Sequence, residues 1–302
     1  MRARLLQRRA RAAAASAAAV AALAAAGCLS TGPQNPGWTL SEAETIDEIQ
    51  RLRSSPGGLE RPVVVITGYA SLPPMASSLA TQLRRLTGAE RDMFVPVDMT
   101  FVNDLRDGVD VVLDALDRRF PHPGGDTGET VEVDVVGVSM GGIVAKLAAE
   151  PEDGRPRLKI NTLYTLGAPH RGADLAHRSP IDQAAQDLMY KSILLVKLHE
   201  NMPRRGYTLV PYAILSDDLV GPRNSAPWGQ SPIWVQGRVI GSHFALQDDD
   251  RLQIDIARRL RGEPPLLERA PLPSAGPNGP PYGAEQLDLS ARDAEPAADE
   301  AR

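Results

Sequence analysis

The sequence predicts an α/β fold with a mainly parallel sheet of about six strands and helices on both faces. Short β-branched apolar runs alternate with amphipathic helical segments through the middle of the chain, which is the pattern of βαβ units. The clearest run, residues 62–67 (PVVVIT), is apolar over most of its length, as expected of a strand covered on both faces. A length of 302 residues with 42% hydrophobic content is enough for one large domain.

The expected strands and helices follow one another in order along the chain. The first helix begins after Ser41, because Glu44 three residues later completes a capping box. The expected strands are 62–67, 93–97, 131–138, 158–166, 208–215 and 233–240, and the expected helices are 41–53, 74–87, 104–120, 141–150, 181–199 and 248–261. Ligands of such sheets bind beyond the carboxyl ends of the strands, so we expect functional residues just after them.

The two ends of the chain differ in composition from this domain, which we place at residues 38–261. Residues 1–27 combine five arginines with a 15-residue alanine-rich run, which is too short to span a bilayer comfortably and is typical of a secretory signal. We interpret residues 28–37 as a short tether. Residues 262–302 are rich in proline, alanine and acidic side chains, a composition that favours a disordered tail.

Cys28 is the one cysteine of the chain, which excludes an intramolecular disulfide framework and a zinc site built on several cysteines. It follows residues 23–27 (LAAAG), and this junction resembles that of a bacterial lipoprotein signal. The resemblance implies lipidation of Cys28 and an exported protein anchored to a membrane of the cell envelope. The alternative is an ordinary secretory signal followed by an incidental cysteine.

The net charge argues against a nucleic-acid partner. The formal charge is -5, with no basic excess. Cleavage before Cys28 would remove five arginines and leave a mature chain of charge -10. The sequence also contains no metal-ligand or dinucleotide motif, so we expect neither a metal nor a cofactor.

The strongest functional signal follows the third expected strand. Residues 137–142 (GVSMGG) form a G-x-S-x-G motif between a strand and a helix, the context that this motif requires. The sharp turn leaves no room for side chains at Gly137 and Gly141 and presents the Ser139 hydroxyl at the edge of the sheet. The motif therefore predicts that Ser139 is a nucleophile, and a tight structural turn is the alternative.

With this motif and residues 165–172 (TLGAPHRG), the sequence resembles the α/β-hydrolase superfamily. The resemblance is to its lipase and esterase members, including triacylglycerol lipases and GPI-inositol-deacylase-like hydrolases, and it covers roughly residues 62–261. It implies a serine hydrolase that cleaves carboxylic esters, lipid or lipid-like, through an acyl-enzyme on Ser139. An acyltransferase that uses the same acyl-enzyme and a non-catalytic lipoprotein that keeps the fold are the alternatives.

A serine hydroxyl needs a base to become an effective nucleophile, and this fold orders nucleophile, acid and histidine along the chain. Of the five histidines, only His243 lies beyond every candidate acid, and it follows the sixth expected strand. Residues 218–222 (DLVGP) match the D-x-V-x-P spacing of relatives, which favours Asp218 as the acid. Asp217 is the alternative, and its side chain is expected to point to the other side of an extended segment.

The oxyanion of the tetrahedral intermediate requires preorganised N–H donors. One expected donor is the backbone N–H of Met140, and the resemblance implies Tyr69, in the loop after the first strand, as the other. Relatives have H-G-x in that loop, whereas this chain has residues 67–69 (TGY). We therefore expect Thr67 to make a different hydrogen bond beneath the loop while the Tyr69 donor is kept.

Residues 173–206 are too long for a simple connection, so we expect a cap there. Its apolar helical stripe over residues 181–199 has two interpretations. The helix either covers an acyl pocket as a lid or packs on the sheet like any other helix.

Overall fold

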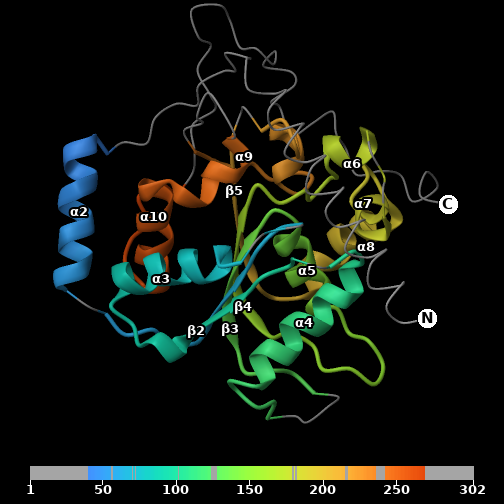
Figure 1. Cartoon of the computed structure of the whole chain (residues 1–302), viewed down its shortest axis with the longest axis horizontal. Helices are drawn as coiled ribbons and strands as arrows, with labels where there is room; N and C mark the ends of the chain where they lie inside the picture. The colour runs from blue at the N-terminus through green and yellow to red at the C-terminus, as the bar shows by residue number, and fades with distance from the viewer. Residues whose placement is uncertain are drawn as a thin grey trace, which may run out of the picture.

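Six parallel strands form a single sheet in the order β2-β1-β3-β4-β5-β6 (Figure 1). The computed structural model describes residues 40–268, apart from residues 56, 70, 72, 101, 124–127, 179, 181, 215–216 and 236–241. The strands are β1 (Val63–Ile66), β2 (Phe94–Val97), β3 (Val133–Val138), β4 (Ile160–Leu166), β5 (Thr208–Ala213) and β6 (Ile233–Trp234). With helices on both faces and the serine turn directly after β3, this is the predicted α/β-hydrolase fold.

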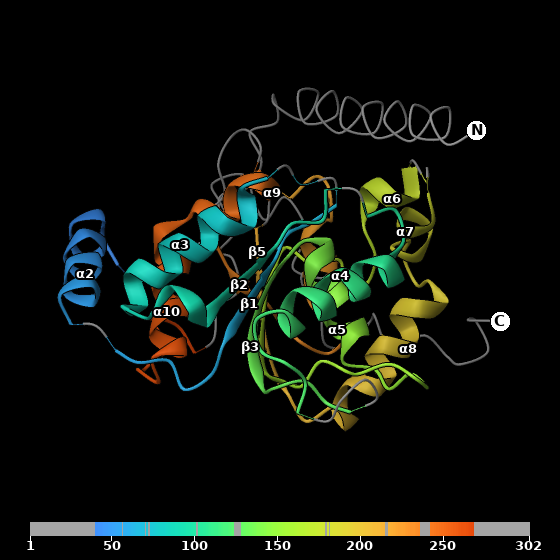
Figure 2. The same cartoon turned by 60° about the horizontal axis from the view of Figure 1, so that its bottom comes forward.

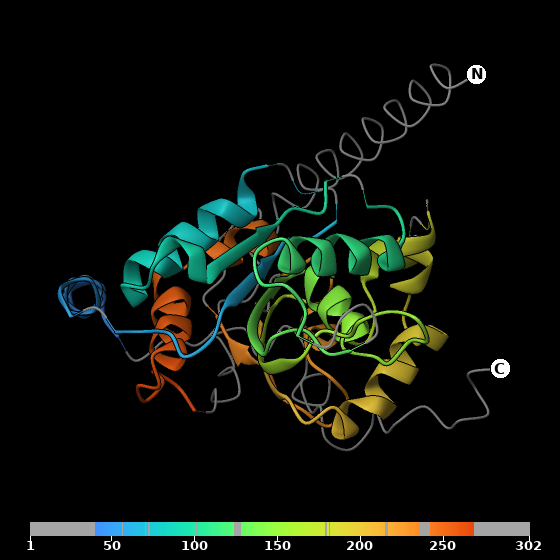
Figure 3. The same ribbon diagram turned by 90° about the horizontal axis from the view of Figure 1, so that it is seen from below.

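Helices cover both faces of the sheet (Figures 2 and 3). One face packs against α3 (Met75–Thr87) and α10 (Asp250–Leu260), and the other against α4 (Leu105–Asp117) and α5 (Met140–Ala148). The buried strand β1 shows the division, since Val63 and Val65 belong to the first core and Val64 and Ile66 to the second. Alternate side chains of a strand point to opposite faces, so a strand covered on both sides is apolar throughout.

The helix start after Ser41 agrees with its sequence signal. Before α2 (Glu42–Ser54), the Ser41 hydroxyl accepts from Glu44 N at 3.3 Å and the Glu44 carboxylate accepts from Ser41 N at 2.7 Å. This is the predicted capping box.

The remaining short elements are η2 (Arg91–Met93), η4 (Met202–Arg204), η5 (Pro222–Ser225), α9 (Ser242–Ala245) and η6 (Leu246–Asp248). Asp249 caps α10 by accepting from Arg251 N and Leu252 N.

Three short helices occupy the connection between β4 and β5, so the prediction of one helix over residues 181–199 was wrong. They are α6 (Asp174–Arg178), α7 (Gln183–Asp187) and α8 (Ile193–Asn201). The break before α8 lies at Lys191, whose φ is 56°, and at Ser192. The Ser192 hydroxyl donates to Asp187 O at 2.5 Å and accepts from Leu195 N at 3.3 Å, so it ends one helical segment and caps the next.

Residues 262–268 pack against the domain, although we expected a disordered tail to begin at residue 262. Leu266 and Leu267 contact the core on the α3–α10 face. Leu266 N donates to the buried carboxylate of Asp255 at 2.6 Å. The predicted tail boundary was therefore wrong for these seven residues, and residues 269–302 lie outside the described part of the chain.

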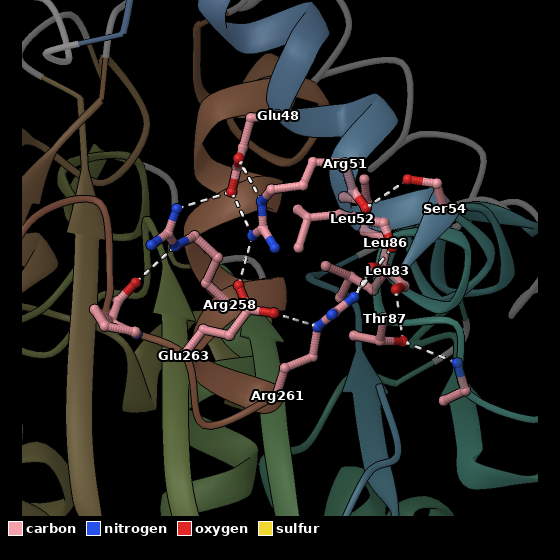
Figure 4. A network of polar contacts seen from close by, with 12 residues as sticks. Glu48, Arg51, Leu52, Ser54, Leu83, Leu86, Thr87, Arg258, Arg261 and Glu263 are labelled. Atoms are coloured by element: carbon pink, nitrogen blue, oxygen red, sulfur yellow. Dashed lines mark hydrogen bonds and ion pairs between the residues drawn. The ribbon is translucent and has the colours of Figure 1, made fainter. Parts of the chain in front are cut away.

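An ionic network joins α2 to the end of α10 and to the segment after it (Figure 4). Glu48 pairs with Arg51 at 2.7 Å and with Arg258 at 2.8 Å, and Glu263 pairs with Arg51 at 2.5 Å and with Arg261 at 2.7 Å. We call this set the α2–α10 clasp. It brings together residues more than 200 positions apart in the sequence.

The predicted signal (1–27), the tether (28–37) and Cys28 lie outside the described residues, as do residues 236–240 of the sixth expected strand. Within the part of the chain that the structure describes, no helix is both long enough and apolar enough to cross a bilayer.

Candidate active site

Ser139 lies at the turn between β3 and α5 with φ 53° and ψ -126°. A positive φ is uncommon for a residue other than glycine and is sterically costly. The surrounding backbone holds this conformation, because Ser139 N donates to Leu166 O at 2.8 Å and Ser139 O accepts from Gly142 N at 3.1 Å. The hydroxyl is consequently presented at the carboxyl end of the sheet, where the sequence predicted it.

The glycines of the turn make its close packing possible. A Cβ on Gly137 would lie 2.6 Å from Gly142 Cα, and one on Gly141 would lie 2.5 Å from Ile66 O. Neither contact is sterically possible without a shift of the backbone, as the motif predicted. Gly142, which the sequence analysis did not single out, packs as closely, since its Cβ would lie 2.7 Å from the Ala168 Cβ.

The structure brings the predicted pair Ser139 and His243 together. His243 Nε2 lies 3.0 Å from Ser139 Oγ, and His243 Nδ1 lies 2.8 Å from Asp217 Oδ2. Asp217 and His243 are both buried. This chain of two hydrogen bonds lets the imidazole accept the serine proton at Nε2 while the carboxylate fixes its tautomer at Nδ1.

The acid next to His243 is Asp217, so the prediction of Asp218 was wrong. The segment is a turn rather than an extended chain, because Gly221 N donates to Asp217 O at 3.1 Å. Within the turn, Asp217 Oδ1 accepts from Leu219 N at 3.0 Å and Val220 N at 2.9 Å, which leaves Oδ2 for His243. Asp218 is exposed. The two neighbouring side chains therefore have different surroundings, and the buried one, Asp217, is the one that contacts His243.

Asp217 also sets the protonation of the histidine. Burial lowers the pKa of His243, but the negative charge of Asp217 and its hydrogen bond raise it by more, so the net pKa lies above the ordinary 6.5. Gly167, with φ 58°, lies against both groups. A Cβ there would be 3.3 Å from Asp217 Oδ2 and 3.3 Å from His243 Nδ1, so the pair packs directly on the backbone after β4.

The loop after β1 approaches the nucleophile as expected of an oxyanion hole. A Cβ on Gly68 would lie 2.7 Å from Ser139 Cβ and 3.3 Å from Ser139 Oγ, and Tyr69 is the residue that directly follows Gly68. Met140 is the first residue of α5. Its backbone N–H is therefore among the four that a helix leaves without an intrahelical partner, and the positive end of the helix dipole lies at the same place.

Thr67 holds the base of this loop by hydrogen bonds. Its hydroxyl lies 2.5 Å from Ser71 Oγ and accepts from Met99 N at 3.1 Å, while Thr67 N donates to Val97 O at 3.0 Å. These bonds are the alternative to the histidine of relatives that the sequence analysis expected. They tie the base of the loop to the end of β2.

The His170 ring is fully buried and bonds to the end of β4. Its Nε2 lies 2.9 Å from Thr165 Oγ1, and burial, together with Lys146 and Arg171 nearby, holds its pKa well below the ordinary value. Arg171 is a structural residue that the sequence analysis did not identify. Its guanidinium donates to Ala226 O at 3.0 Å and Pro227 O at 3.1 Å, and so it holds the chain that follows the acid turn.

A backbone bond and a side-chain bond attach the acid turn to the chain after β4. Leu175 N donates to Leu219 O at 2.9 Å, and Asn224 Nδ2 donates to Asp174 Oδ1 at 3.1 Å.

Among the described residues, no group of three or more histidine, cysteine, aspartate or glutamate side chains could hold a metal ion.

Residues 99–220 match the family model of the PGAP1-like alpha/beta domain. The matched part includes Ser139 and Asp217 and ends before His243. No curated protein matches the chain by sequence.

Several solved structures are similar to this chain, among them the following two. The mature form of the lipase BlEst2 from Bacillus licheniformis is 15% identical, with 68% of this chain and 94% of that chain covered and a TM-score of 0.46. A lipase-esterase related protein from Clostridium acetobutylicum is 10% identical, with 68% and 96% covered and a TM-score of 0.41.

Proposed function

We propose that this protein is a serine hydrolase that cleaves carboxylic esters through an acyl-enzyme on Ser139. The observation that carries the proposal is the hydrogen-bonded chain from Ser139 Oγ through His243 to Asp217. It lies beside a glycine loop and a helix start that are suited to bind an oxyanion.

The geometry supports the following reaction. Ser139 Oγ attacks the ester carbonyl carbon while His243 Nε2 takes the hydroxyl proton, and Asp217 stabilises the imidazolium. The backbone N–H groups of Met140 and Tyr69 bind the oxyanion. When the carbon–oxygen bond to the alcohol breaks, His243 returns the proton to the leaving oxygen. Water, deprotonated by His243, then attacks the acyl-enzyme, and His243 gives this proton to Ser139 Oγ as the acid is released.

An apolar acyl group is the proposed substrate class. Phe244 follows the base directly, its ring centroid lies 5.5 Å from that of His243, and its side chain is 40% exposed. An exposed aromatic ring beside the base offers apolar surface to a substrate that approaches Ser139. This contact favours a lipid or lipid-like ester over a highly polar one.

The test is replacement of the nucleophile. We expect Ser139→Ala to abolish both hydrolysis of p-nitrophenyl esters and labelling by a fluorophosphonate probe. Ser77→Ala, at an exposed serine of α3, is the matched control and should retain both. Undiminished labelling of Ser139→Ala would contradict the assignment. A series of acyl lengths, with and without micelles, tests the preference for apolar substrates.

We further propose that the mature chain is attached to a membrane through lipidated Cys28, on the strength of the signal-like residues before it. Several acyl chains on one residue suffice for stable attachment, since each buried methylene contributes about 0.8 kcal/mol. Cys28→Ala should move the protein from the membrane fraction to the soluble fraction, whereas Ser30→Ala should not. Continued membrane association of Cys28→Ala would contradict this proposal.

A further inference from the structure

A single carboxylate connects the loop beside the nucleophile to the start of α7, in the connection between β4 and β5. Tyr69 Oη donates to Asp182 Oδ2 at 2.5 Å. The other oxygen of the same carboxylate, Oδ1, accepts from Ala185 N at 2.8 Å and so caps α7. Asp182 therefore contacts the loop after β1 and the first turn of α7 at once.

Tyr69 is in a position where small displacements matter. It directly follows Gly68, which lies against Ser139, and its backbone N–H is the second proposed oxyanion donor. An oxyanion donor is effective only when it is held in place before the reaction. Displacement of a group by about 1 Å can cost on the order of 10² in rate.

The anchor at the other end of the bond is held to the domain. Ala184, two residues after Asp182, is fully buried, and its N–H donates to Asn103 O at 2.9 Å. Thr67 and Ser71 hold the base of the loop to the end of β2. The Tyr69–Asp182 bond adds a second attachment between these two residues, so the oxyanion loop is held both at its base and at Tyr69.

We propose that Asp182 is a positioning residue for the oxyanion hole. By accepting the hydrogen bond of the Tyr69 hydroxyl, it fixes the backbone N–H of Tyr69 toward the reacting carbonyl oxygen. The segment that carries α7 thereby contributes to the rate of the chemical step. This inference rests on the proposed ester hydrolysis at Ser139.

Two single variants and their combination test the proposal. Tyr69→Phe removes the hydroxyl and keeps both the ring and the backbone N–H. Asp182→Ser keeps a side chain that caps α7 about as well but is too short to reach Tyr69. We expect each to lower kcat/KM by about 10- to 30-fold with KM within about twofold, below the 10²–10³ of losing a whole donor. The double variant should be no worse than either single one, because both remove the same bond.

A transition-state analogue separates positioning from a general structural effect. An aliphatic trifluoromethyl ketone adds to the serine and places an anionic oxygen in the oxyanion hole. Its inhibition constant should rise in parallel with the loss of kcat/KM in Tyr69→Phe and Asp182→Ser. Tyr207→Phe is the matched control, since Tyr207 is a half-buried tyrosine that packs against the same core, and it should change neither quantity.

The outcomes distinguish the two proposals. If wild type is labelled at Ser139 and hydrolyses esters, but Tyr69→Phe and Asp182→Ser stay within twofold of it, only the role of Asp182 is overturned. Multiplied losses in the double variant would also overturn it, because the two residues would then act independently. A wild-type chain that fluorophosphonate does not label at Ser139 would overturn the proposed function and this inference with it.

Discussion

Asp217 Oδ2 lies 2.8 Å from His243 Nδ1, whereas the adjacent carboxylate of Asp218 is exposed. The two residues are both aspartates and are adjacent in the chain, but only Asp217 contacts His243. They therefore form a matched pair for measuring what the acid contributes.

Asp217→Asn should lower kcat for ester hydrolysis by about 10⁴, because the amide neither stabilises the imidazolium nor holds the required tautomer. Asp218→Asn should stay within about twofold of wild type. Steady-state kinetics on one p-nitrophenyl ester measures both. A larger loss in Asp218→Asn than in Asp217→Asn would reverse the assignment of the acid.

The pH profile should reflect the raised pKa of His243. The base is the neutral imidazole, so kcat/KM rises as the pH increases through the pKa of His243 in the free enzyme. We expect the midpoint of this rise above pH 6.5. Without the charge of Asp217, burial remains as the force that lowers the pKa, so the residual activity of Asp217→Asn should have its midpoint at lower pH. A wild-type midpoint below 6.5 would contradict this expectation.

Gly68→Ala should lower the reactivity of Ser139. The added methyl group would lie 2.7 Å from Ser139 Cβ, so the loop or the serine must move, and a shift of about 1 Å can cost on the order of 10² in rate. The rate constant of fluorophosphonate labelling measures this loss. Gly58→Ala is the control, because a Cβ there meets nothing within 4 Å. Equal labelling rates in the two variants would show that the close approach is unimportant.

Lys146→Met should stabilise the fold at neutral pH. Lys146 is buried, and its ammonium nitrogen has no hydrogen-bond partner among the described residues. Burial, partly opposed by Glu150, lowers its pKa from 10.5 to about 8. The unfolded chain therefore binds this proton more tightly than the folded chain, and the cost to stability is complete below pH 8 and disappears above about 10.5.

The size of the gain follows from this shift. At pH 7 the free energy of unfolding of Lys146→Met should rise by up to about 3 kcal/mol, at about 1.4 kcal/mol for each pKa unit. Urea denaturation at pH 7 and pH 10 should show the gain shrinking at the higher pH. Lys197→Met, at an exposed lysine of α8, should have little effect at either pH. A gain independent of pH would mean that burial of the charge is not its cause.

A chain that ends at residue 261 should melt at a lower temperature than one that ends at residue 268. The shorter chain loses the ion pairs of Glu263, the packing of Leu266 and the N–H that Leu266 donates to buried Asp255. A loss of about 2 kcal/mol corresponds to roughly 4–8 °C in a domain of this size. Equal melting temperatures, measured by circular dichroism, would place the domain end at residue 261 after all.

Motifs tied to local backbone geometry were predictable from the sequence. Periodicity identified the strands that form the sheet, and the G-x-S-x-G turn together with chain order identified Ser139 and His243. These features depend on a few adjacent residues, or on an order that the fold imposes. The acid was less predictable, because the choice between Asp217 and Asp218 depends on which carboxylate the backbone of a turn binds, and the spacing of a motif does not contain that information.

Other errors have a similar physical cause. The apolar stripe over residues 181–199 favoured one continuous helix. The Ser192 hydroxyl instead bonds to backbone groups on both sides of it, so one helix ends before Ser192 and α8 begins after it. The composition of the C-terminal segment favoured disorder, yet Leu266 finds a buried acceptor on Asp255. Hydrophobic periodicity and composition do not encode such hydrogen bonds, so they become visible only in the folded chain.

The α2–α10 clasp has a consequence for the order in which the chain can fold during synthesis. Arg51 and its partner Glu263 are 212 positions apart, which a ribosome adding about 5–20 residues per second covers in roughly 10–40 s. During that interval α2 can pack on α3 but cannot complete its ion pairs. Among the described helices, the one synthesised first is thus among the last to gain all its contacts, because Glu263 must emerge before the clasp can form.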